Sequence, residues 1–143
     1  MRTSIIILCL FISHLVLASS EMSVGQSDVH KLGASIYDVK GMGNWKKGSR
    51  GGQVRLVITR MAKQDEVFLQ WVQWNEKGPE KVKATAKIKE IEERGRFQVD
   101  FIRRETEGHS RQIVLGLENL HDKSSTRIVI QVQDLGIYTS KFE

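Results

Sequence analysis

The fold is indicated most directly by the stretch QVRLVIT, residues 53–59, where apolar and polar side chains begin to alternate. In an extended chain Val54, Leu56 and Ile58 lie on one face and Arg55 lies on the other. Comparable alternation recurs downstream, over residues 82–88, 97–101, 113–117 and 128–132. A period of two residues predicts strands that turn one face toward an apolar core.

Further strands are expected over residues 66–75, 36–39 and 137–139, and turn-forming residues such as Pro79 and Gly95 separate the stretches. Because the connections are short, neighbouring strands are expected to pair antiparallel. The sequence therefore predicts an all-β domain over residues 36–143. It would be a single antiparallel β-sandwich or an open up-and-down barrel of about six to eight strands.

The expected core consists of the apolar members of the alternating stretches. They are Val54, Leu56, Ile58, Phe97, Val99, Phe101, Ile113, Leu115, Leu117, Ile128 and Ile130.

Two segments are harder to assign. The segment GMGNWKKGSRGG, residues 41–52, has the glycine density of a loop. Residues 79–94 lie between Pro79 and Gly95, which suits a helix. Apolar side chains at alternate positions from Val82 to Ile88 instead favour a strand there.

The N-terminus has the three-part pattern of a secretory signal. Arg2 precedes an apolar run over residues 5–17, and small residues follow from Ala18. The run is shorter than the ~20 residues of a membrane-spanning helix, although a retained anchor is the alternative. We therefore expect a cleavable signal peptide over residues 1–18 and a flexible arm over 19–35.

The only cysteine, Cys9, lies within the expected signal peptide, so the mature chain would have no disulfide. It also has no Asn-x-Ser/Thr glycosylation site. Both features favour a bacterial envelope compartment. The prediction is an exported protein, periplasmic or secreted, with no integral membrane span in its mature form.

The formal net charge of +5 favours anionic partners without indicating nucleic acid. Two groups of cations are candidates for binding. One lies in the glycine-rich segment beside Trp45 and contains Lys46, Lys47 and Arg50. The other would share one strand face and contains Lys81, Lys83, Lys87 and Lys89. A solvated surface is the alternative interpretation of both groups.

Trp71 and Trp74 are three residues apart, so a regular strand would turn them to opposite faces. One is expected in the core. Trp74 is the candidate for an exposed indole that could stack on a sugar ring or a protein partner. Packing of both tryptophans is the alternative.

Catalytic patterns are weak. The histidines after residue 18 are His30, His109 and His121, and none has metal-site spacing, so neither a metal nor a cofactor is expected. Asp100 and Glu118 could form a carboxylate pair in space, but no motif distinguishes them.

The preferred hypothesis is a non-catalytic binding or structural module for an anionic envelope polysaccharide or an envelope protein. A β-barrel carrier of a small apolar ligand and a hydrolase are the alternatives.

Overall fold

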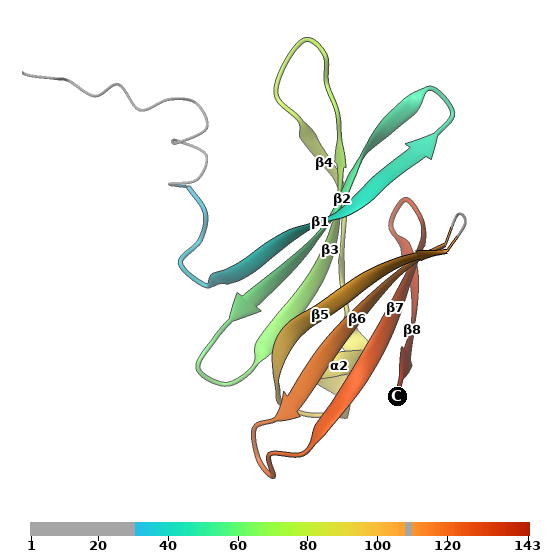
Figure 1. Ribbon diagram of the computed structural model, residues 1–143. Helices are drawn as coiled ribbons and strands as arrows, with labels where there is room; N and C mark the ends of the chain where they lie inside the picture. Colours follow the sequence, from blue (N-terminus) through green and yellow to red (C-terminus); the bar gives the residue numbers. More distant parts are fainter. Residues whose placement is uncertain (1–30, 108–109) are drawn as a thin grey trace, which may run out of the picture. The chain divides into compact units, whose positions relative to one another are not determined.

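The protein is described here by a computed structural model that covers residues 31–107 and 110–143. The expected signal peptide and most of the expected arm lie outside these residues. The described chain forms eight strands and one short helix (Figure 1). In chain order they are β1 Ile36–Lys47, β2 Arg50–Arg60, β3 Asp65–Gln73, β4 Lys81–Lys87, α2 Lys89–Arg94, β5 Phe97–Glu107, β6 Ser110–Asn119, β7 Ser125–Asp134 and β8 Ile137–Phe142. No helix in this part of the chain is both long and apolar enough to cross a membrane.

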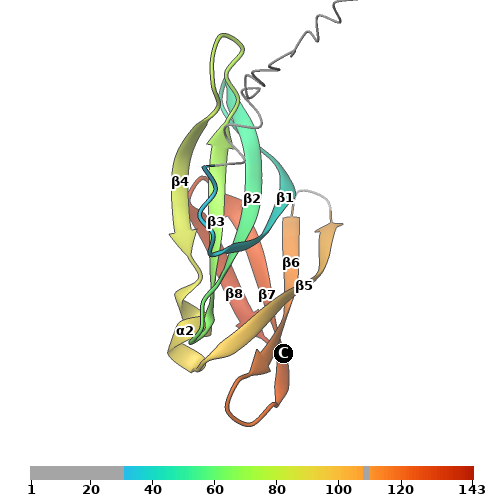
Figure 2. The same cartoon turned by 90° about the vertical axis from the view of Figure 1, so that its left-hand side faces the viewer.

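The strands form two antiparallel sheets of four, ordered β1-β2-β3-β4 and β5-β6-β7-β8. Each sheet is a meander of consecutive strands, and α2 joins them (Figures 1 and 2). The predicted all-β domain of about eight strands is confirmed. Between the two forms that the sequence left open, the structure takes the sandwich, with the sheets packed through their apolar faces.

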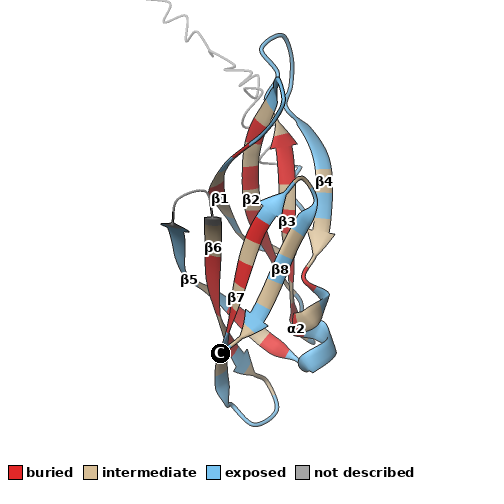
Figure 3. Ribbon diagram, turned by 90° about the vertical axis from the view of Figure 1, so that its right-hand side faces the viewer, coloured by how far each residue is buried: buried red, intermediate tan, exposed pale blue. Residues whose placement is uncertain are grey.

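The inward faces of both sheets supply one core (Figure 3). The predicted core residues all belong to it, although Phe101 is only half-buried at its rim. Trp71 and Leu69 have no exposed surface. These large side chains pack into the core that the two sheets share.

The glycine-rich segment is not a loop, so that prediction was wrong. Residues 36–47 and 50–60 form a long hairpin, closed by a short turn at Gly48. Glycine is required inside the hairpin because a Cβ at Gly52 would lie 1.8 Å from the Val72 carbonyl oxygen. The glycines mark close packing between strands rather than the absence of strands.

Residues 79–94 contain both of the structures considered for them. The strand β4 ends at Lys87, and the helix α2 begins at Lys89. Ile88 and Ile91 are both buried, so the apolar spacing changes from two to three at the junction. The Tyr138 hydroxyl reaches this junction, 3.0 Å from the Lys87 carbonyl oxygen.

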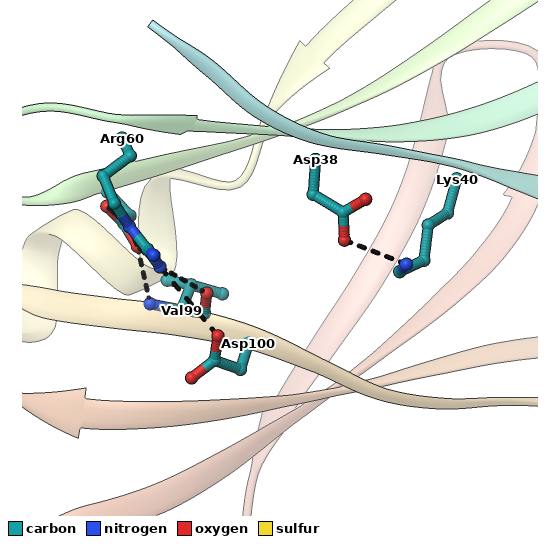
Figure 4. A network of polar contacts seen from close by, with 6 residues as sticks. Asp38, Lys40, Arg60, Val99 and Asp100 are labelled. Carbon is teal, nitrogen blue, oxygen red and sulfur yellow. Dashed lines mark hydrogen bonds and ion pairs between the residues drawn. The ribbon is translucent and has the colours of Figure 1, made fainter.

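A polar cluster ties the two sheets together at the turn between β2 and β3 (Figure 4). Asp65 is buried and accepts hydrogen bonds from Arg60, at 2.9 Å, and from the backbone N–H of Val99, at 2.8 Å. The Asp65 hydrogen bond is the main reason that the pKa of Arg60 is raised above its ordinary value. The separate pair of Asp38 and Lys40, 3.1 Å apart, lies partly exposed on β1.

Candidate functional site

The candidate site lies where the β1–β2 and β3–β4 hairpins end side by side, the upper end of Figure 1. Two neighbouring surface hollows occur there, of about 380 and 430 Å³. Arg50 and Trp74 line both hollows. Lys81 and Lys83 line the first, and Lys46 lines the second. We call these five residues, Lys46, Arg50, Trp74, Lys81 and Lys83, the hairpin-tip site.

Trp74 is the aromatic surface of this site. It follows the last residue of β3, and its side chain is 47 % exposed, whereas Trp71 is fully buried. Of the two arrangements that the sequence left open, the structure has one core tryptophan and one exposed tryptophan. The Trp74 backbone N–H donates to the Gly51 carbonyl at 3.1 Å, and the indole lies over Gly51. These two contacts with Gly51 limit the movement of the exposed indole ring.

Trp45 has a different role from the one expected. Its side chain is only 6 % exposed, and its indole N–H donates to the Val72 carbonyl at 3.1 Å. Trp45 lines the second hollow, but a buried indole with its donor already used offers little surface to a ligand. Trp45 instead holds the β1–β2 hairpin against β3 and so supports the site from below.

The cations of the site are exposed and uncompensated. Lys46, Arg50, Lys81 and Lys83 are all exposed, and none of them forms an ion pair with another described residue. Lys47, predicted with them, pairs with Asp134 at 3.2 Å, so its charge is partly compensated. The local field is positive, and it would attract an anion.

The predicted lysine ladder is broken in two places, so that interpretation was wrong. Trp71 pairs with Ala84 while Val72 pairs with Val82, which leaves Lys83 as an extra residue in β4. The strand then ends at Lys87, and Lys89 is carried by α2 instead.

Lys87 is also engaged, because its ammonium lies 2.7 Å from Glu66 and 2.8 Å from Glu92. These two carboxylates raise the pKa of Lys87, and Lys87 lowers the pKa of Glu92. Only Lys81 and Lys83 of the ladder belong to the hairpin-tip site.

Polar residues outside the predicted set also line these hollows, among them Asn75 and Ser49. Both lie next to a residue that was singled out, so adjacency to Trp74 and Arg50 was the available signal. Asn75 also shapes the turn, since its side-chain oxygen accepts from the Lys77 backbone N–H at 3.2 Å.

Asp100 and Glu118, considered as a carboxylate pair, line one hollow of about 540 Å³ on β5 and β6. Arg127 and Ile102 line it too. The Asp100 side chain is 63 % exposed.

Comparison with known proteins adds no family to this description: no family model, no curated protein and no solved structure matches the chain.

Proposed function

We propose that this protein is a non-catalytic binding module that takes an anionic polysaccharide at the hairpin-tip site. The observation that carries the proposal is the convergence of Trp74 and Arg50 on two adjoining hollows, with three lysines around them. An indole face stacks on sugar rings, and cations pair with the carboxylate or phosphate groups of the chain. The expected signal peptide would deliver the protein to an envelope compartment where such polymers occur.

Individual contacts at this site are weak. Exposed ion pairs contribute ~0.2–1 kcal/mol each, so no single lysine is expected to dominate. Affinity would come from several cations acting together on a repeating ligand. Salt should weaken it, because the Debye length falls from ~10 Å at ~0.1 M to ~3 Å at ~1 M.

The acidic residues of the same loop, Glu76 and Glu80, do not line either hollow. Gln73, which does line one, adds a side-chain amide beside Trp74. Amides suit the hydroxyl groups of a sugar, as they both donate and accept. The combination favours a charged glycan over a bare inorganic polyanion.

The test is retention on immobilised polygalacturonate, a carboxylated polysaccharide, across a salt series. We compare the wild-type protein with a triple variant, Lys46→Gln, Lys81→Gln and Lys83→Gln. The matched control is Lys63→Gln, Lys89→Gln and Lys123→Gln, which removes the same charge in the turn after β2, in α2 and in the turn after β6.

The site variant should bind roughly 3- to 100-fold more weakly than the control variant. This range corresponds to the combined free energy of three exposed ion pairs. Trp74→Ala should weaken binding without changing its salt dependence. Equal losses in the two triple variants would refute the assignment of the site. Failure of the wild-type protein to bind at low salt would refute the proposed ligand.

A further inference from the structure

Two arginines extend from β5 and β6 toward the first strand of the other sheet. Arg104 pairs in register with Ile113, and Arg111 lies two residues before Ile113 on β6. Residues two apart on a strand share a face, so both arginines lie on the side of the fully buried Ile113, which faces the core.

Both side chains reach the same short segment of β1. The Arg104 guanidinium donates to the Gly41 carbonyl at 3.3 Å. The Arg111 side chain passes so close to Gly43 that a Cβ on Gly43 would lie 3.3 Å from the arginine Cδ. Gly43 also has φ of +94°, a conformation that favours glycine. The absence of a side chain at Gly43 leaves room for the arginine stem.

The two charges are not neutralised by the described part of the chain. Arg60 and Arg103 pair with the carboxylates of Asp65 and Glu105, whereas no described residue forms an ion pair with Arg104 or Arg111. One guanidinium nitrogen of Arg111 is buried and has no hydrogen-bond partner among the described residues. Burial and the nearby Arg104 both lower the pKa of Arg111.

Arg104 is exposed and Arg111 is half-buried, but a buried guanidinium nitrogen without a hydrogen-bond partner is costly, and the positive charge of Arg104 repels that of Arg111. An oxyanion would relieve both problems, because the planar guanidinium fork matches the oxygens of carboxylate, sulfate and phosphate groups. We propose that Arg104 and Arg111, beside Gly41 and Gly43, form an oxyanion-binding site between the sheets. This site uses none of the hairpin-tip residues and does not depend on the proposed function.

The test uses the purified protein with sodium sulfate, against sodium chloride at matched ionic strength. Binding is followed by thermal stabilisation and by the arginine Nε–Hε resonances in ¹⁵N spectra. Wild-type protein should show saturable stabilisation specific to sulfate, with shifts of the Arg104 and Arg111 resonances. Phosphate should reproduce the effect if the site accepts oxyanions in general.

Arg111→Gln and Arg104→Gln should each weaken sulfate binding roughly 10- to 100-fold, the effect of a lost charge-assisted hydrogen bond. Arg103→Gln is the control, since it removes the same charge from the same strand as Arg104 but from a residue paired with Glu105. Without sulfate, Arg111→Gln should be at least as stable as wild type, because it removes a half-buried charge that forms no ion pair with a described residue.

Absence of a saturable, sulfate-specific effect in the wild-type protein would overturn the proposal. Equal effects in wild type and in both site variants would overturn it as well. If Arg111→Gln fails to fold, the comparison of Arg104→Gln with Arg103→Gln decides the question.

Discussion

Replacing Asp65 by alanine tests the cluster that links the two sheets. The Asp65 side chain is 4 % exposed, and it accepts from the Val99 backbone N–H and from two nitrogens of Arg60. The substitution leaves the N–H group of Val99 without its acceptor. It also leaves the Arg60 guanidinium without its closest carboxylate.

The expected cost has two parts. A buried N–H that loses its acceptor costs ~1–3 kcal/mol. The Arg60 side chain is 32 % exposed and can regain water, so the lost ion pair adds only ~0.5–1 kcal/mol. We therefore expect Asp65→Ala to lower the free energy of unfolding by ~1.5–4 kcal/mol. Asp65→Asn, which keeps an acceptor for Val99, should cost about half as much.

The assay is urea unfolding followed by tryptophan fluorescence, with linear extrapolation to water. Asp100→Ala is the matched control, because that carboxylate lies 3.9 Å from Arg60 but is 63 % exposed. It should change the free energy of unfolding by less than ~0.5 kcal/mol. An Asp65→Ala loss below ~1 kcal/mol, or one no larger than that of Asp100→Ala, would refute the argument.

Three other expectations concern packing and pH. Phe97→Ala should lower the free energy of unfolding by ~3–5 kcal/mol, because Phe97 is buried. Phe101 is only half-buried, so Phe101→Ala should lower it by less than ~2 kcal/mol. Equal losses in urea unfolding would contradict this difference. Gly52→Ala should lower the free energy of unfolding by ~3 kcal/mol or more, since the new Cβ would collide with the Val72 carbonyl. A melting temperature equal to that of the wild-type protein would contradict this. Burial and then a neighbouring carboxylate raise the pKa of Tyr138 to about 12. In the unfolded chain the Tyr138 hydroxyl ionises near pH ~10, before it does so in the folded protein. The free energy of unfolding should therefore fall between pH ~10 and about 12, and Tyr138→Phe should remove this loss.

Most strands from Gln53 onward could be predicted from the sequence because apolar and polar side chains alternate along them, with a period of two. Of β1, only residues 36–39 were expected as a strand. Its edge position and its glycines remove the contrast between faces, so strand and loop look alike in the sequence. The glycine-rich segment forms a strand because Gly52 packs closely against β3. That contact joins residues about twenty positions apart in the sequence.

The candidate site was predicted in part. Residue type was enough to select Arg50 and the lysines, since Lys and Arg are rarely buried in a core. Trp74 was selected by its spacing of three residues from Trp71. Their meeting at one end of the sheet depends on which strands pair. The extra residue at Lys83 in β4 cannot be inferred from alternation alone. Arg111 gave no signal in the sequence, because its burial depends on the approach of β1 to β6.

The order of the strands has a consequence for how the chain could be divided. Each sheet is made wholly of consecutive strands, and the backbone passes between the sheets only through α2. A cut within α2 would therefore separate two fragments without interrupting any strand pairing. Each fragment would carry one uncovered apolar face, and those faces are complementary because they form the shared core. We therefore expect the two fragments to re-form the sandwich when fused partners bring them together, which would suit a split-protein complementation assay.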